Sequence, residues 1–299
     1  MQRIDGYGAP GGARPLAGAS VALGNFDGVH LGHQALIAAA ARARPDAPLG
    51  VVTFEPHPRQ VFRPDDPPFR LTSDAVRARL LDGLGVDRLA VIPFEPSLMR
   101  MSPAHFARQV LVEGLGIAHV TVGADFCFGR GRKGTPAILE ALGCALGFGV
   151  SVLALVGDET AGTGQFSSTA AREAVQAGRM QDAAAILGRA HLVAGRVAHG
   201  DKRGRTLGYP TANLAFADQL VPAFGVYAAR VSVIEGAHAG TYDAVASIGE
   251  RPTFGKNVPN FEVHLFDFAG DLYDAEIEVA LVAFQRGEIA YEGREALIA

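Results

Sequence analysis

The first half of the chain alternates short apolar runs with longer segments of helical periodicity. The apolar runs lie at 21–23, 50–54, 89–94, 120–123 and 150–156. The spacing of apolar and capping residues predicts helices after Gly32, over 74–84, from Ser102 and Pro103 onward, and over 135–146. Because strands that alternate with helices build parallel sheets with right-handed crossovers, we expect a doubly wound α/β fold.

The second half of the chain has a different pattern. Short helices are predicted at 172–177 and 180–187, and glycine-punctuated sequence with the runs typical of β-strands follows. The predicted strands lie near 225–233, 242–248, 261–268 and 277–284. We therefore place a domain boundary near Gly188, with one domain over 1–188 and a second over 189–299.

One glycine-rich segment, 24–34, joins the first predicted strand to the first predicted helix. Free backbone N–H groups and the helix dipole favour an anion at such a junction, and glycine lets the backbone approach a ligand closely. His30 and His33 are three residues apart, so both imidazoles can donate hydrogen bonds to one bound phosphate. The alternative is a glycine-rich turn that carries two surface histidines.

Two further loops follow predicted strands. Pro56 and Pro58 stop regular structure and are expected to expose His57 between them. The segment 124–134 places three cations among glycines, which suits a loop that faces a phosphate or a nucleotide. Loops at strand ends line the ligand crevice of open α/β sheets. Taken alone, each loop could instead be a solvated turn or charge run.

A third candidate phosphate site lies at the start of the helix predicted near 172. Ser168 or Thr169 can cap that helix, and the Arg172 guanidinium, one turn in, can bind a phosphate at the same N-terminus. Capping alone would explain the hydroxyl groups but not the arginine.

Composition narrows the class of protein. The 299 residues are 48% hydrophobic, which is enough for two packed cores. The net charge of −4 and the pI near 6.1 disfavour a broad nucleic-acid-binding surface. The two cysteines, Cys127 and Cys144, form no disulfide framework or zinc-ligand set, and no apolar run has the length of a signal peptide or a membrane span. We expect a cytoplasmic protein that binds neither nucleic acid nor membrane.

Together these motifs resemble the bacterial bifunctional riboflavin kinase/FAD synthetase family. The matching segments are 24–33, 53–58, 122–126 with Phe128 and Gly129, and 167–169 with Arg172. The first and last of these segments are also motifs found throughout the nucleotidylyltransferases. The resemblance implies a nucleotidylyltransferase-type parallel sheet followed by a small antiparallel β-barrel with riboflavin kinase activity.

The second domain carries its own part of the resemblance, because 193–213 is similar to the riboflavin kinase signature. Gly204 and Gly208 permit a loop that wraps a nucleotide, and Thr211 and Asn213 offer oxygen ligands suited to Mg²⁺. The alternative there is an ordinary Pro-Thr turn. The resemblance implies that Glu262 is the base toward the riboflavin 5′-hydroxyl, although a lone strand glutamate is otherwise a solvated residue.

The implied enzyme phosphorylates riboflavin with ATP and then adenylates FMN with a second ATP, releasing pyrophosphate; Mg²⁺ serves both steps. ATP, riboflavin, FMN and FAD are its expected small-molecule partners. The implied catalytic residues are His30, His33, Arg172 and Glu262. The implied ATP- or phosphate-binding residues are Gly24, Phe26, Asp27, Gly28, Gly32, Ser168, Thr169, Gly204 and Thr211. The implied flavin-binding residues are Phe54, Pro56, His57, Asp125 and Phe128, and the implied metal ligands are Thr211 and Asn213.

The chain departs from the family pattern at several positions. Ala190 and His191 replace Pro-Tyr, Ser247 replaces Asn, Ala171 replaces Ile, and Ala290 and Tyr291 replace a basic residue and Phe. These positions concern packing or flavin contacts and leave the phosphate ligands intact. Two other functions are compatible with the sequence. The substitutions would fit a flavin-binding regulatory protein that has lost turnover, and the phosphate motifs would fit a nucleotidylyltransferase with another acceptor.

Overall fold

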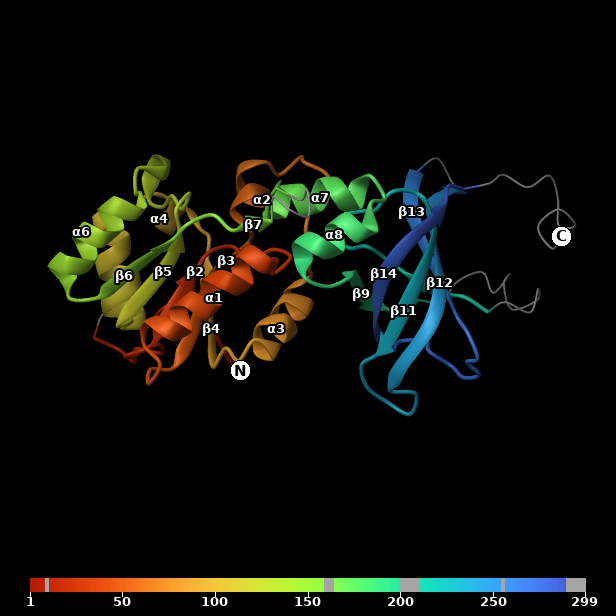
Figure 1. Cartoon of the computed structure of the whole chain (residues 1–299), viewed down its shortest axis with the longest axis horizontal. Helices are drawn as coiled ribbons and strands as arrows, with labels where there is room; N and C mark the ends of the chain where they lie inside the picture. Colours follow the sequence, from red (N-terminus) through yellow and green to blue (C-terminus); the bar gives the residue numbers. More distant parts are fainter. Residues whose placement is uncertain (9–10, 159–163, 199–209, 254–255, 289–299) are drawn as a thin grey trace, which may run out of the picture. The chain divides into compact units, whose positions relative to one another are not determined.

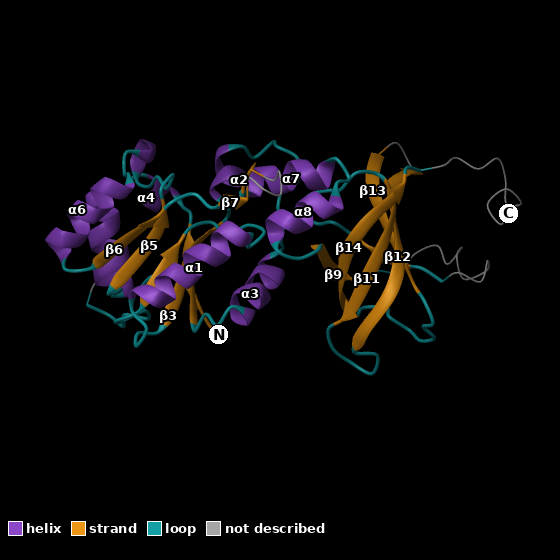
Figure 2. Cartoon of the chain, in the orientation of Figure 1, coloured by secondary structure: helices purple, strands orange, loops and turns teal. Residues whose placement is uncertain are grey.

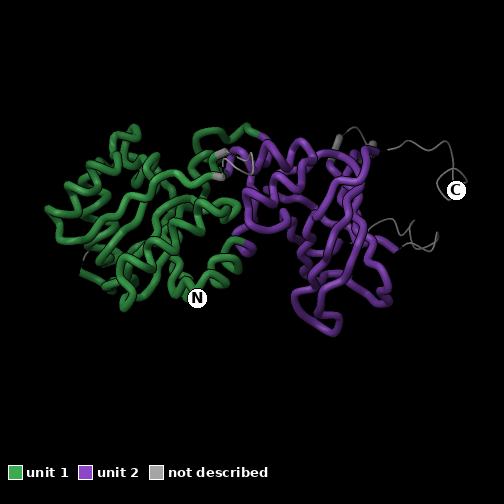
Figure 3. The backbone as a smooth tube through the Cα atoms, viewed as in Figure 1, with its two compact units in different colours: residues 1–66, 77–167 green, residues 67–76, 168–299 purple. Residues whose placement is uncertain are grey.

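The computed structural model describes residues 1–8, 11–158, 164–198, 210–253 and 256–288. Its elements are labelled in Figure 1 and coloured by type in Figure 2. The chain forms two compact units, shown in Figure 3. Unit 1 comprises Met1–Asp66 and Arg77–Ser167, and unit 2 comprises Pro67–Val76 and Ser168–Ala299. The domain boundary near Gly188 stays a prediction.

Unit 1 is built on a six-stranded parallel sheet. Its strands are β1 (Gln2–Asp5), β2 (Ser20–Leu23), β3 (Leu49–Glu55), β4 (Arg88–Pro93), β5 (His119–Gly123) and β6 (Gly149–Leu153). The spatial order is β1-β4-β3-β2-β5-β6, and neighbouring strands are parallel throughout. The doubly wound sheet is therefore confirmed. The central strand β2 pairs with β3 on one side and β5 on the other, so the strand order reverses there.

Helices cover both faces of this sheet. The helical segments of unit 1 are α1 (Leu31–Ala43), α2 (Pro58–Phe62), residues 77–83 of α3 (Asp74–Gly83), α4 (Pro96–Met99), α5 (Pro103–His105), the π-helix η1 (Phe106–Leu115), the 3₁₀-helix η2 (Arg130–Arg132) and α6 (Pro136–Leu146). A short antiparallel pair, β7 (Gly157–Asp158) and β8 (Gly164–Gln165), completes the unit. Apolar residues of α1 and α3 pack on one face of the sheet, and those of η1 and α6 pack on the other.

The helix starts follow the local sequence. Ser102 caps α5 by accepting a hydrogen bond from the His105 N–H at 3.2 Å, and Pro103 follows it as predicted. Thr135 caps α6 in the same way, with Pro136 next. By contrast, α7 begins at Ser168, so Ser168 and Thr169 are its first residues. The expectation that one of them precedes and caps the helix is therefore wrong.

Unit 2 contains two helices and a six-stranded antiparallel sheet. The helices are α7 (Ser168–Gln176) and α8 (Met180–Leu187). The strands are β9 (His191–Arg196), β10 (Ala212–Leu214), β11 (Gly225–Val233), β12 (Gly240–Thr253), β13 (Lys256–Leu265) and β14 (Glu276–Arg286), in the order β10-β13-β12-β11-β14-β9. The Ala198 N–H donates to the Asn213 carbonyl at 2.9 Å. Because this bridge joins β10 to the residues after β9, the sheet curls back on itself, and the small antiparallel barrel is confirmed.

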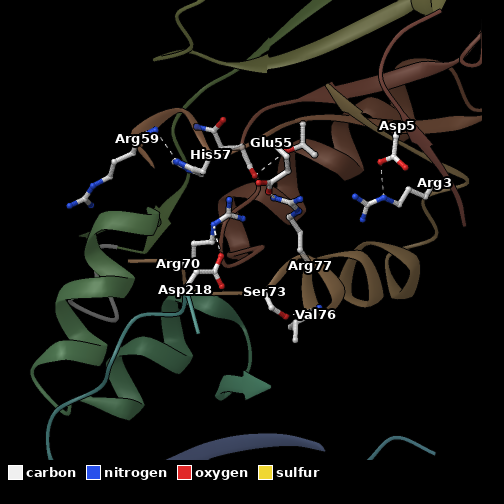
Figure 4. Close-up of polar contacts among 12 residues, drawn as sticks. Arg3, Asp5, Glu55, His57, Arg59, Arg70, Ser73, Val76, Arg77 and Asp218 are labelled. Carbon is white, nitrogen blue, oxygen red and sulfur yellow. Dashed lines mark hydrogen bonds and ion pairs between the residues drawn. The ribbon is translucent and has the colours of Figure 1, made fainter. Parts of the chain in front are cut away.

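A segment from the first half of the sequence, Pro67–Val76, belongs to unit 2. Arg70 pairs with Gln219 as an isolated parallel bridge, and the Leu220 N–H donates to the Arg70 carbonyl at 2.8 Å. The Arg70 guanidinium also forms an ion pair with Asp218 at 3.2 Å (Figure 4). The sequence pattern did not predict this pairing.

A buried histidine bonds across three strands of unit 1. His119 is 8% exposed; its Nδ1 lies 3.4 Å from Ser20 Oγ, and its Nε2 lies 3.0 Å from Ser151 Oγ. Because the Ser20 hydroxyl donates to the Ala40 carbonyl at 2.6 Å, we infer that Nδ1 carries the ring proton and that Nε2 accepts from Ser151. Burial lowers the pKa of His119 below its ordinary value of 6.5, and the charge of Arg44 lowers it further.

Acidification should therefore loosen the sheet of unit 1 around His119. The lowered pKa means that the unfolded state binds more protons, so the stabilisation is full above about pH 6.5 and is lost as the pH falls through the folded-state pKa, at a slope of up to ~1.4 kcal/mol per pH unit. Amide hydrogen-exchange protection in β2, β5 and β6 should fall below that pH in the wild type and much less in His119→Gln. The same pH response in His119→Gln would contradict this assignment, and His105→Gln, at an exposed site, serves as the control.

Candidate functional site

The segment between β2 and α1 brings the two predicted histidines together. Their rings stack with centroids 3.7 Å apart, and the ring of Phe26 lies 5.0 Å from that of His33. His30 is the N-cap of α1, and its Nδ1 accepts a hydrogen bond from the His33 N–H at 3.3 Å. An Nδ1 that accepts a hydrogen bond leaves the ring proton of a neutral imidazole on Nε2. The pair can thus supply ring N–H donors at the N-terminus of a helix, where anions are favoured.

The backbone of this segment is tightly constrained. Phe26 and Val29 have positive φ angles of 53° and 43°, a conformation that costs energy for residues other than glycine and is concentrated at functional sites. Gly28, with φ of 82°, adopts the same region without that cost. A Cβ at Gly32 would lie 3.1 Å from both the His30 ring and the Phe166 carbonyl oxygen. Gly32 therefore leaves room for the His30 ring, and its predicted role in close approach to a ligand stays a prediction.

The predicted Pro56–Pro58 loop is a helix start in the structure. His57 is the N-cap of α2, and its Nδ1 accepts from the Arg59 N–H at 3.1 Å. Its side chain is only 7% exposed, so the expectation that the two prolines expose it is wrong. The proline at the first helical position explains the difference, because it starts a short helix and the histidine side chain turns back to cap it.

A row of phenylalanine rings lies beside the carboxyl ends of β3, β4 and β5. Its members, in contact order, are Phe62, Phe94, Phe54, Phe106, Phe128 and Phe126, with successive centroids between 5.6 and 6.4 Å apart. The sequence identified Phe54 and Phe128 as flavin-binding residues but did not assign Phe62, Phe94 or Phe106 to the site. Phe62 is 63% exposed, which is unusual for so large an apolar side chain and marks an accessible end of the row.

The predicted cationic loop begins beside this row. Phe128 and Gly134 exchange backbone hydrogen bonds of 3.1 and 2.8 Å, which close the loop that carries the cations. Arg130, Arg132 and Lys133 are exposed, as is Asp125 just before them. Exposure is compatible both with a phosphate-facing loop and with a solvated charge run.

Arg172 makes its described contacts within unit 2. Its Nε–H donates to the Phe69 carbonyl at 2.9 Å, and its guanidinium carbon lies 5.3 Å from the centre of the Phe69 ring. Ser168 and Thr169 lie one turn earlier on the same helix, α7. The guanidinium therefore joins α7 to the segment Pro67–Val76. The contact of Arg172 with a phosphate stays a prediction.

A second group of predicted residues meets on the barrel of unit 2. Thr211 Oγ1 donates to Glu262 Oε2 at 3.3 Å, and Asn213 lies directly opposite Glu262 in the pairing of β10 with β13. Asn260 Nδ2 donates to Glu262 Oε1 at 2.9 Å, a contact that the sequence did not predict. Ser247, a departure from the family pattern, lies opposite Glu262 on the other neighbouring strand, β12. The predicted Gly204 and Gly208 lie outside the described residues.

Metal ions in proteins are commonly held by clusters of acidic, histidine and cysteine side chains. Over the described ranges, no group of three or more such residues is arranged to hold a metal ion. The predicted ligands Thr211 and Asn213 are of another type, with hydroxyl and amide oxygens. In the same described ranges, no helix is both long and apolar enough to cross a membrane.

Comparisons with known proteins cover both units. A family model described as FAD synthetase matches residues 13–170, and one described as riboflavin kinase matches residues 187–299. A bifunctional riboflavin kinase/FMN adenylyltransferase from Pseudomonas fluorescens is 42% identical over 286 residues, covering 94% of this chain and 88% of that protein. The chain belongs to the bifunctional riboflavin kinase/FMN adenylyltransferase family.

Other members of the bifunctional riboflavin kinase/FMN adenylyltransferase family are nearly as similar. The Escherichia coli K12 protein is 36% identical over 285 residues, covering 95% of this chain and 89% of that protein. A crystal structure described as a macrolide-efflux protein from Streptococcus pneumoniae has a TM-score of 0.87 and 30% identity, covering 100% of this chain and 95% of that one. The family resemblance predicted from the motifs is thus confirmed, while the roles of individual residues stay predictions.

Arg172 should be needed for the adenylation of FMN. Arg172→Lys keeps the charge but loses the planar fork for phosphate and the Nε–H that binds Phe69. We expect FAD formation from FMN to fall by about tenfold or more, since even one lost charge-assisted bond is worth about 1.5–3 kcal/mol. Arg179→Lys, at an exposed pair with Asp182 just beyond α7, is the matched control. Wild-type adenylation kinetics in Arg172→Lys would remove Arg172 from the site.

Proposed function

We propose that this chain makes FMN from riboflavin and ATP on the barrel of unit 2, and makes FAD from FMN and ATP with the histidine pair of unit 1. The observation that carries the proposal is the pair of separate polar clusters, His30 with His33 and Thr211 with Glu262, each inside the region matched by the corresponding family model. One cluster suits phosphate binding without a nucleophile, and the other has a carboxylate beside oxygen ligands.

Adenylation requires a phosphate oxygen of FMN to attack the α-phosphorus of ATP. A new P–O bond forms, the bond between the α-phosphorus and the bridging oxygen breaks, and pyrophosphate leaves with the electron pair. His30 and His33 donate hydrogen bonds to the oxygens on which charge develops, and the N-terminus of α1 favours the same anion. Catalysis is positioning and electrostatic stabilisation, so no covalent enzyme intermediate is needed.

The flavin of that reaction is assigned to the phenylalanine row. A planar tricyclic ring needs an apolar surface, and the accessible part of the row is the exposed Phe62 with the half-buried Phe94 and Phe126. Phe54, Phe106 and Phe128 are buried beneath it, and Phe54 directly precedes the segment with Pro56 and His57, two of the predicted flavin-binding residues. The exposed Phe62 provides the entrance to this surface.

Phosphorylation of riboflavin requires a hydroxyl to attack the γ-phosphorus of ATP. Glu262 accepts the proton of the 5′-hydroxyl as the new P–O bond forms and ADP leaves. Asn260 and Thr211 hold the two carboxylate oxygens, which orients the base. Ser247 lies opposite Glu262 in the pairing of β12 with β13. Because its side chain carries no charge, it leaves the hydrogen bonds of Glu262 to Asn260 and Thr211 intact.

Thr211 and Asn213 would hold a divalent cation, which we propose is Mg²⁺. The donor set fits, because hard oxygen ligands suit Mg²⁺ and the Thr211 hydroxyl proton points to Glu262, leaving its lone pairs for a ligand on another side. When bound, the ion neutralises charge on the ATP phosphates. We also place the enzyme in the cytoplasm, because the free Cys127 and Cys144 fit a reducing compartment.

Incubation of the protein with riboflavin, ATP and Mg²⁺, followed by separation of the flavins, tests the proposal. FMN and FAD should both appear. Flavin binding without product would favour the flavin-binding regulatory protein. FMN that accumulates without FAD, even when FMN and ATP are supplied, would favour a nucleotidylyltransferase with another acceptor.

Replacing His30 and His33 together by Ala should stop FAD formation while FMN still accumulates. Loss of one oriented donor typically costs about 10²–10³ in kcat, so the double variant should lose at least that much in adenylation. Both products are measured in one reaction that starts from riboflavin. His105→Ala, an exposed histidine elsewhere in unit 1, is the control. FAD formation at the wild-type rate in the double variant would refute the assignment.

Glu262→Gln should slow the kinase step alone. Glutamine keeps the shape and can still bind Thr211, but it cannot accept the proton, and general-base catalysis contributes about 10²–10⁴-fold. FMN formation from riboflavin should fall by that order, while riboflavin binding and adenylation of supplied FMN stay near wild type. The control is Glu235→Gln at an exposed turn. An unaffected kinase rate would remove Glu262 from the mechanism.

A further inference from the structure

Arg77 is a buried cation that the mechanism above does not use. Its side chain lies on α3 and is 2% exposed. One guanidinium nitrogen, Nη1, lies 2.7 Å from Oε1 of Glu55, whose side chain is 22% exposed (Figure 4). The pair therefore joins a helix on one face of the sheet to the last residue of β3.

Glu55 lies where three parts of the proposed adenylation site meet: the segment between β2 and α1, the phenylalanine row, and the start of α2. Its side chain shares a sheet face with that of Thr53, because alternate strand residues point the same way, and the Thr53 hydroxyl donates to the Asn25 carbonyl at 3.0 Å. Its own carbonyl accepts from the Phe94 N–H at 2.7 Å, and Phe94 belongs to the phenylalanine row. The next two residues are Pro56 and His57.

The cost of burying this pair argues for a role beyond packing. A buried ion pair is often no more stabilising than apolar side chains of the same volume, because both charges lose their hydration. An apolar pair would fill the space but would not fix the direction of the strand end. Without Arg77, moreover, Glu55 would leave an uncompensated negative charge at the edge of the sheet that must accept the phosphates of FMN and ATP.

We propose that Arg77 is a positioning residue for adenylation. It holds the Glu55 carboxylate and thereby fixes the chain that leads to Pro56, His57 and Phe94 on the flavin side of the site. The inference rests on the proposed function, since it concerns the substrate FMN. It requires an effect on FMN that exceeds any effect on ATP.

The test uses four variants of the full-length chain: Arg77→Lys, Arg77→Met, Glu55→Gln and the double variant Arg77→Met/Glu55→Gln. Adenylation is measured with FMN and ATP varied separately, and riboflavin phosphorylation is measured on the same preparations as a check of folding. The double variant removes both charges, so it avoids the uncompensated buried charge that could unfold a single variant. Arg88→Met is the matched control, because Arg88 begins β4, at the opposite end of the strands, and donates to the Pro15 carbonyl at 2.8 Å.

The double variant should raise the KM for FMN by about 10- to 100-fold, the range expected when a substrate-positioning element shifts by up to an ångström, while the KM for ATP changes far less. Arg77→Lys, which keeps the charge, should recover part of the loss, and Arg88→Met should leave the KM for FMN unchanged. A folded double variant with a wild-type KM for FMN would overturn the inference, as would equal increases for FMN and ATP. A wild-type protein that makes no FAD would overturn the proposed function itself, and the inference with it.

Discussion

Parallel pairing of β2 with its two neighbours is the constraint on which the proposed adenylation site of unit 1 depends. Parallel strands end at the same edge of a sheet, so the registers of β2 with β3 and β5 bring three loops to one side. These loops carry the histidine pair after β2, His57 after β3 and the cations after β5. Residues separated by about a hundred positions in the sequence are thus brought to one edge of the sheet.

The two faces of the same sheet support different chemistry. The face covered by α1 and α3 carries the histidine pair, whose ring N–H groups suit a phosphate, and the ion pair of Glu55 with Arg77, which holds the end of β3. The opposite face carries the phenylalanine row, packed with η1, which is suited to an apolar ring. Because alternate residues of a strand face opposite ways, the neighbours Phe54 and Glu55 can serve both sides. A substrate that is part aromatic ring and part phosphate matches this division.

Periodicity predicted most of the long elements, because burial of one face leaves a repeating signal in the sequence. It missed β1, since Gln2–Asp5 is an edge strand with mostly exposed residues and one apolar side chain, and its partner β4 is distant in sequence. Local rules also misjudged His57, whose burial follows from a cap formed by its own side chain. The histidine pair was found because a short motif carries it. Glu262 was assigned only through the family resemblance, and its contact with Thr211 was not predicted. The phenylalanine row, Asn260 and Arg77 depend on contacts between distant segments, and no local pattern reports those.

The assignment of Pro67–Val76 to unit 2 means that the chain passes between the units three times, after Asp66, after Val76 and after Ser167. The two units are therefore not consecutive modules that one cut can separate. A cut near Gly188 would leave Arg172 with Phe69 but would part Arg70 from Asp218 and Leu220. Exchange of one half between relatives should then succeed only when 67–76 is exchanged together with the barrel.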